Sequence, residues 1–195
     1  MLRAILAPFR RFARDTQGNM VIELLLMLPF FLWAILGIIT YFYGFHMKTI
    51  NLKGAYTVSD LLSREMEGPV TPAYIEGLDN VFNYITNTAD DLGRLRVTLV
   101  TCTQNCGVND TGRVLEIDWS YGTGGLNPMT TDDLNTTFEP NIPIMPSNER
   151  AILVETQLLY RPPVTSIWFG VETMQMDSFV VTRPRFVPKL EWSGG

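Results

Sequence analysis

Charged residues are scarce in this chain of 195 residues. They make up 18% of the sequence, whereas roughly 25% is typical of soluble globular domains, and 46% of the residues are apolar. A sequence this apolar can offset its ordering entropy by burial, which excludes intrinsic disorder for most of the chain. The shortage of charge also argues against a freely soluble enzyme.

Histidine and cysteine are scarcer still, because the chain has only His46, Cys102 and Cys106. These three residues cannot provide the four ligands of a structural zinc site. Any Ser-His-Asp or Cys-His catalytic group would have to use His46, which directly follows a long apolar run. We therefore expect no catalytic residues, no metal, no cofactor and no small-molecule substrate.

The missing charges are concentrated in one run, Leu24 to Phe45, which holds 22 residues without Asp, Glu, Lys or Arg. As a helix, this run spans about 33 Å, which is enough to cross a bilayer core of about 30 Å. A removed signal peptide is the competing interpretation, but its apolar core would be shorter and followed by small residues rather than by Tyr41 and Phe42. We therefore predict a retained transmembrane helix over residues 19–45.

The charges that flank this run differ in sign. Four Arg and one Asp give residues 1–18 a net charge of +3, whereas 11 basic and 19 acidic residues give the remainder −8. The positive-inside tendency places residues 1–18, a basic leader, in the cytoplasm and residues 46–195 outside it. The acidic exterior part lacks the clustered Lys and Arg of a nucleic-acid-binding protein, so we expect no nucleic-acid partner.

Glu23 stands at the start of the apolar run, where an unpaired carboxylate is costly. In one interpretation it reaches interfacial water and pairs with Arg14. In the other, the chain is cut after Gly18, so that Asn19 gains a free α-amino group and Glu23 becomes the fifth residue, about one helical turn away. Glu23 would then pair with that amine, or with the amine of a neighbouring copy, and set the register of packed helices.

Several of these features together resemble a known family. The basic leader, Gly18 followed by Glu23, the Leu-rich helix and Leu28-Pro29 resemble the TadE-like (TadE/TadG) proteins of tight-adherence (Flp) pili, which have a type IV prepilin-like N-terminus. The resemblance covers about residues 10–45, with a weaker match near Arg183-Pro184-Arg185.

This resemblance implies a minor pilin or pseudopilin that prepilin peptidase processes after Gly18 and whose helix packing depends on Glu23. It further implies an inner-membrane protein with a periplasmic C-terminal domain, which either stays in the membrane or is incorporated into an extracellular pilus, with other pilins and the assembly platform as partners. Two alternatives stay open: an uncleaved single-pass scaffold, and a sensor that displays an extracytoplasmic binding domain. Pro29 is expected to kink the helix, either without function or to aid packing in a bundle.

The exterior part has the pattern of an α+β domain. Apolar spacing predicts that the first helix continues to about Leu62 and that an amphipathic helix runs from Pro72 to about Thr88. Alternating segments predict four strands of an antiparallel sheet, at residues 94–101, 113–121, 151–160 and 177–182. A turn at residues 122–125 and a long loop at 126–148, with a short helix near 131–135, connect them. The apolar stripe of the second helix is expected in the core: Tyr74, Ile75, Leu78, Val81, Phe82 and Ile85.

Cys102 and Cys106 lie at the end of the first predicted strand. Outside the cytoplasm such a pair predicts a disulfide. A bridge across this short loop contributes about 2 kcal/mol in the chain-entropy model.

Overall fold

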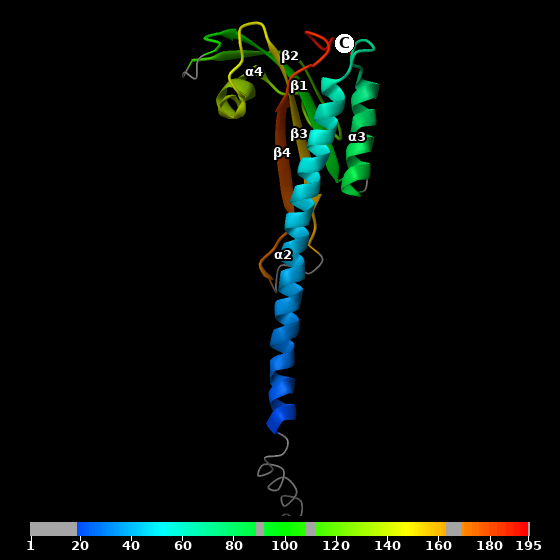
Figure 1. The fold of residues 1–195 in the computed structure, drawn as a ribbon, viewed down its shortest axis with the longest axis vertical. Helices are drawn as coiled ribbons and strands as arrows, with labels where there is room; N and C mark the ends of the chain where they lie inside the picture. Colours follow the sequence, from blue (N-terminus) through cyan, green and yellow to red (C-terminus); the bar gives the residue numbers. More distant parts are fainter. Residues whose placement is uncertain (1–18, 89–91, 108–111, 163–168, 195) are drawn as a thin grey trace, which may run out of the picture.

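The computed structural model describes residues 19–88, 92–107, 112–162 and 169–194. Its first element, α2, runs without interruption over Asn19–Ser63. At 1.5 Å per residue, this helix is about 68 Å long, roughly twice the thickness of a bilayer core. Figure 1 shows that the lower part of α2 projects alone, while its upper part lies against the remaining elements. The predicted continuation of the first helix is confirmed.

The second helix, α3, covers Pro72–Thr86 and packs against the upper part of α2. The side chain of Thr71 accepts a hydrogen bond from the Tyr74 N–H, and Pro72 occupies the first turn, where its missing N–H costs nothing. Asn87 ends the helix in the left-handed conformation. These terminal signals explain why the amphipathic pattern becomes a helix with these bounds.

The predicted four-stranded antiparallel sheet is confirmed, and its strand order is β2-β1-β3-β4. Its strands are β1 (Gly93–Gln104), β2 (Val114–Gly122), β3 (Arg150–Tyr160) and β4 (Met174–Thr182). Three of them are longer than predicted, because β1 continues to Gln104, β3 begins at Arg150 and β4 begins at Met174. The α+β architecture is therefore confirmed.

Both faces of the sheet are covered. On one face, α2 and α3 enclose a core in which Leu62, Phe82 and Leu99 are fully buried. On the other face, the segment between β2 and β3 supplies Met129, Leu134 and other buried apolar residues. That segment includes the predicted short helix, as α4 (Thr131–Asp133) and a π-helix at Leu134–Phe138. What the sequence indicates as a loop therefore covers one face of the sheet and contributes to the second hydrophobic cluster.

The C-terminal segment returns to the start of α3. Val70 pairs with Trp192 in an isolated parallel bridge, and the Arg185 N–H donates to the Ser63 carbonyl at 2.9 Å. The Trp192 ring stacks on Trp119 with centroids 4.8 Å apart. This segment thus caps the end of α2 and closes the core beside β2.

The prediction that the apolar stripe of α3 lies in the core is wrong for Val81, which is 37% exposed. The polar residues Asp79 and Asn83, on the same helix, are buried instead. The Asp79 carboxylate accepts hydrogen bonds from the Asn83 amide at 3.1 Å and from the Thr123 hydroxyl at 2.9 Å. Because these bonds satisfy it, a polar stripe joins α3 to the sheet where a purely apolar one was predicted.

Candidate assembly surface on the long helix

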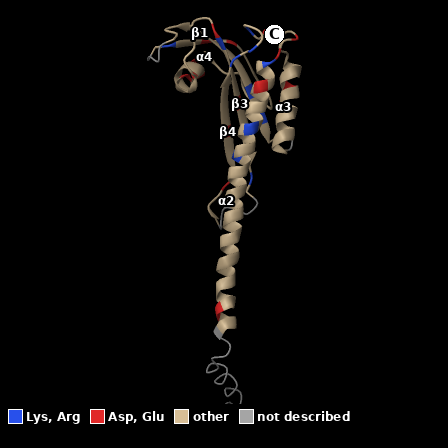
Figure 2. Cartoon of the chain, in the orientation of Figure 1, with Lys and Arg blue, Asp and Glu red and all other residues tan. Residues whose placement is uncertain are grey.

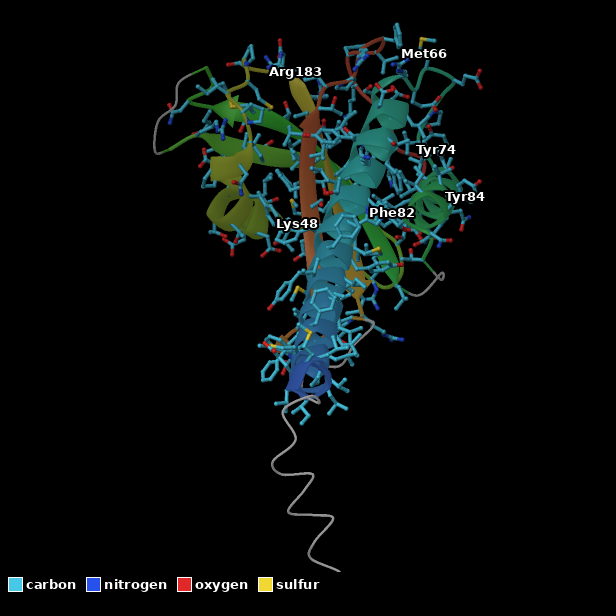
Figure 3. All side chains as sticks on the ribbon, turned by 60° about the horizontal axis from the view of Figure 1, so that its bottom comes forward. Lys48, Met66, Tyr74, Phe82, Tyr84 and Arg183 are labelled. Carbon is cyan, nitrogen blue, oxygen red and sulfur yellow. A yellow bond between two sulfur atoms is a disulfide. The ribbon has the colours of Figure 1, made fainter. Side chains whose placement is uncertain are left out.

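The lower end of α2, Met20–Leu32, is an apolar surface without cover. Leu25 is 70% exposed and Phe30 is 72% exposed, and large apolar side chains project on every side of the helix (Figure 3). Helices that are apolar all round occur buried, either in lipid or among other helices. In the described part of the chain, α2 is the one helix long and apolar enough to cross a membrane.

Glu23 is the one charge on this lower end, and Figure 2 shows the surrounding helix almost free of charged side chains. Its side chain is exposed, and no other described residue forms an ion pair or hydrogen bond with it. Arg14, the expected interfacial partner, lies outside the described residues. Within the described chain the carboxylate is thus available to a cation from elsewhere, such as a neighbouring copy.

The expected processing site is only partly described. Gly18 lies outside the described residues, whereas Asn19 is the first residue of α2. Four residues separate Asn19 from Glu23, a rise of about 6 Å along the axis. A carboxylate at this spacing is within one turn of the N-terminus that cleavage would create. The helix continues through Pro29, and a kink there stays a prediction.

The upper end of α2, Gly37–Ser63, is fixed to the sheet by polar contacts as well as by the core. Asn51 is fully buried and faces β3 and β4. Its amide donates to the Met176 carbonyl at 2.8 Å, and its oxygen accepts from the Thr156 hydroxyl at 2.7 Å. Further down, the Tyr160 hydroxyl donates to the Thr40 carbonyl at 3.2 Å. These bonds fix both the rotation and the height of the helix relative to the sheet.

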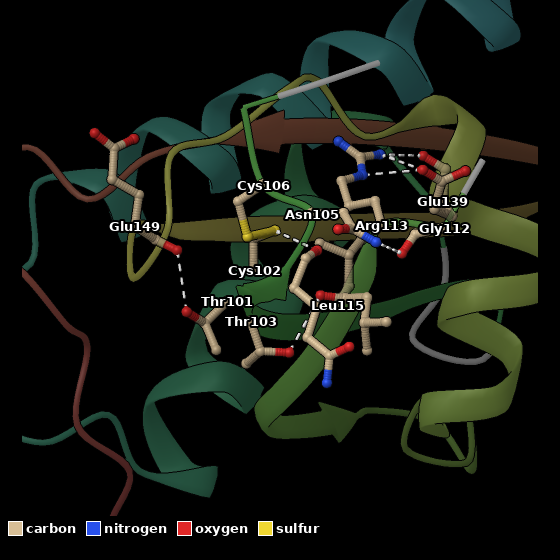
Figure 4. The surroundings of a disulfide bond; sticks show 12 residues. Thr101, Cys102, Thr103, Asn105, Cys106, Gly112, Arg113, Leu115, Glu139 and Glu149 are labelled. Atoms are coloured by element: carbon tan, nitrogen blue, oxygen red, sulfur yellow. Dashed lines mark hydrogen bonds and ion pairs between the residues drawn. A yellow bond between two sulfur atoms is a disulfide. The ribbon is translucent and has the colours of Figure 1, made fainter. Parts of the chain in front are cut away.

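The opposite pole of the molecule holds the disulfide. Cys102 and Cys106 are bridged, with their Cα atoms 5.9 Å apart, which confirms the prediction (Figure 4). Nearby, the buried Arg113 guanidinium donates to the Glu139 carboxylate at 2.9 Å and to the carbonyls of Ile142 and Pro143. The sequence pattern placed Arg113 only at the start of a strand. In the structure it ties the segment before β3 to this pole.

Outside α2, the described residues offer little that resembles a reactive site. They contain no group of three or more His, Cys, Asp or Glu side chains that could hold a metal ion. A hollow of about 270 Å³ lies beside Phe138 and Phe179. Of the charged residues that line it, Arg96 and Glu155 pair with each other, and Asp177 accepts a hydrogen bond from the Gln175 amide. On α2 itself, the His46 side chain is exposed and stacks on Phe42. The bare lower end of α2 is therefore the strongest candidate for a functional surface.

Comparison of the chain with protein-family models, with curated proteins and with solved structures finds no match. The functional argument therefore rests on the residues and their arrangement.

Proposed function

We propose that this chain is a structural component in the assembly of a tight-adherence type pilus, acting as a minor pilin or pseudopilin like the TadE-like proteins. The division of α2 is the observation that carries the proposal. Its lower end is bare, apolar and marked by the lone Glu23, whereas its upper end is built into an α+β domain. The protein is anchored in the bacterial inner membrane by residues 19–45, which include this lower end, and holds its domain in the periplasm.

The same bare surface suits two environments in turn. In the membrane, acyl chains cover it, and in an assembly, the helices of other pilins cover it. In the assembly, Glu23 sets the register of the packed helices, because the attraction between a carboxylate and a nearby positive charge is strongest in a medium of low dielectric constant. Cleavage after Gly18 by prepilin peptidase supplies that charge as the α-amino group of Asn19, on the same or a neighbouring copy.

The mass of the N-terminus tests the processing step. Protein isolated from its native host is digested, and the N-terminal peptide is identified by mass spectrometry, with and without an active prepilin peptidase. We expect a peptide that begins at Asn19 only when the peptidase is active. Residues 1–18 found intact in both samples would contradict processing and support the uncleaved scaffold or sensor.

Substitution of Glu23 tests the register. Glu23→Ala is expected to leave the amount of protein in the membrane unchanged and to abolish assembly, measured by crosslinking to other pilins and by piliation. Glu67→Ala, which removes an exposed carboxylate beyond the upper end of α2, is the matched control and should assemble normally. Normal piliation of the Glu23→Ala strain would refute the assigned role of this carboxylate.

A further inference from the structure

Phe169, from the connection between β3 and β4, contacts α2 well below the sheet. Its ring stacks on Trp33, with the ring centroids 5.7 Å apart. Its backbone carbonyl accepts a hydrogen bond from the Tyr41 hydroxyl at 3.2 Å. Figure 1 shows the described residues that lead into β4 beside the helix, beneath the lower ends of the strands. The exterior domain therefore reaches down along the predicted membrane helix.

Gly37 makes this contact possible. Trp33, Gly37 and Tyr41 recur every four residues, so they lie on one stripe of α2. A Cβ atom added at Gly37 would lie 3.0 Å from Cε1 of Phe169, which is closer than such contacts normally come. The absent side chain leaves a gap on the stripe, and the Phe169 ring fills it. Gly37 is consequently buried, although Ile38 next to it is 69% exposed.

The level of this contact follows from the helical rise. Fourteen residues separate Glu23 from Gly37, which is about 21 Å along the axis. With Glu23 at the inner boundary of a hydrocarbon core about 30 Å thick, Phe169 lies about 9 Å inside the outer boundary. This depth rests on the membrane insertion proposed above. Phe169 then belongs to the membrane rather than to the periplasm.

The hydrogen bond to Phe169 supports this placement independently. A backbone carbonyl cannot be left unpaired in hydrocarbon, where no water can replace the missing donor. Tyr41 supplies that donor from the helix itself. In water the carbonyl would need no such partner. Because the predicted transmembrane helix satisfies this carbonyl, Phe169 meets the requirement for backbone at membrane depth.

An open hollow surrounds the contact. It has a volume of about 540 Å³ and is lined almost entirely by apolar groups, from Trp33, Ala34, Gly37, Ile38, Tyr41 and Phe169. We propose that this hollow holds an acyl chain of a phospholipid in the outer leaflet, so that Phe169 is a second membrane contact of the exterior domain. Its occupant is hydrocarbon because one wall of the hollow is the apolar helix, at a level where lipid is the surrounding medium.

Spin labels on the full-length protein in phosphatidylcholine vesicles test the depth. Both native cysteines are bridged, so each introduced cysteine is the one free thiol. The label at Phe169→Cys should be accessible to oxygen and shielded from a water-soluble nickel chelate, as should the membrane control Leu26→Cys. Tyr84→Cys, on the 87% exposed side chain of α3, should show the opposite preference.

The outcomes separate this inference from the proposed function. A label at Phe169→Cys that behaves like Tyr84→Cys, while Leu26→Cys stays in lipid, overturns the inference and leaves the membrane anchor intact. A label at Leu26→Cys that is open to the nickel chelate overturns both.

The identity of the occupant is tested by disrupting the wall of the hollow. Native mass spectrometry of the detergent-solubilised protein should show a retained phospholipid, and Gly37→Leu should lose it because the new side chain displaces the Phe169 ring, which lines the hollow. Gly44→Ala is the control, since a Cβ there meets only ordinary contacts with Tyr160 at 3.8 Å. Equal phospholipid retention by the Gly37→Leu variant would refute the site. Efficient disulfide crosslinking between copies through Ile38→Cys would show that a second helix, not lipid, fills the hollow.

Discussion

The two ends of α2 belong to one uninterrupted helix but have opposite surroundings. At the lower end, Leu25 is 70% exposed, whereas at the upper end Leu62 is fully buried against the domain. Composition separates them only in part, because the upper end carries Lys48, Lys53 and Asp60 but also buries apolar residues such as Leu62. The upper end obtains its partners from its own chain, and the lower end must obtain them from lipid or from other chains. Stability and assembly should therefore depend on different parts of the same helix.

The largest difference between the two ends is expected for leucine truncations. Leu62→Ala leaves a cavity in the core and should lower the free energy of unfolding by about 2–5 kcal/mol. Leu25→Ala removes the same atoms from an exposed site and should change it by less than about 0.5 kcal/mol. Urea unfolding of the detergent-solubilised protein, followed by intrinsic tryptophan fluorescence to which the buried Trp119 contributes, measures both. Equal losses would show that the lower end also folds against the domain.

A second comparison concerns buried and exposed polar groups on the upper end. Asn51→Ala leaves the Thr156 hydroxyl and the Met176 carbonyl without their partner, which should cost about 2–4 kcal/mol. Thr57→Ala is the control, because the exposed Thr57 hydroxyl bonds only to the Lys53 carbonyl one turn earlier. Its unfolding midpoint should stay within error of the wild-type value. An Asn51→Ala variant as stable as Thr57→Ala would show that water replaces the lost bonds.

Helical period and strand alternation were sufficient to predict α2, α3 and the four strands, because those signals are local. They could not predict that Asp79 is buried, since its partner Thr123 lies 44 residues away in sequence and pairs with it only after the sheet has formed. The same limit applies to the segment before β3, whose apolar residues, such as Met129 and Leu134, lack a regular period. Long-range partners, not local propensity, decide these positions.

The candidate surface divides in the same way. An apolar run with Glu23 at its start is visible in the sequence as a possible membrane helix. The boundary between the bare and the covered part of the helix is not visible in the sequence, because Phe169, which covers Gly37, lies 132 residues further along the chain. Gly37 and Tyr41 looked like ordinary members of the apolar run. A glycine followed one helical turn later by a tyrosine does not indicate that another segment of the chain packs there.

Glycine substitutions sharpen the contrast within α2. A Cβ at Gly54 would lie 2.7 Å from Cδ2 of Phe82, which packs between α2 and α3 (Figure 3), so Gly54→Ala should destabilise the domain by about 1–3 kcal/mol. Gly44→Ala meets no such obstacle and should be neutral or stabilising by up to about 1 kcal/mol, since alanine has the higher helix propensity. Thermal unfolding of the two variants compares them directly. A stabilised Gly54→Ala variant would mean that α3 moves freely relative to α2.

The smallest expected effect is a pH dependence just beyond the upper end of α2. The Glu65 carboxylate accepts hydrogen bonds from the N–H groups of Glu67 at 2.8 Å and Met66 at 3.0 Å, and from the Tyr74 hydroxyl. The bond from Glu67, then that from Tyr74, lowers the pKa of Glu65 below its ordinary value of 4.5. Burial and the Glu65 carboxylate raise the pKa of Tyr74, so that its hydroxyl remains a donor in acid and at neutral pH.

The sign of the effect follows from the charged form. Ionised Glu65 is favoured in the folded state, so its stabilisation is present above pH 4.5 and is lost as the pH falls through the lower folded-state pKa. The loss should amount to a few tenths of a kcal/mol, about the value of a partly exposed charged contact. Unfolding free energies measured between neutral pH and pH 3 should show it for the wild type, and Glu65→Gln should remove this component of the slope. Glu65 and Asn51 share no contact, so the pH-dependent stabilisation by Glu65 should also be present in the Asn51→Ala variant. Its disappearance in that variant would show that the contacts of Glu65 and Asn51 are energetically coupled.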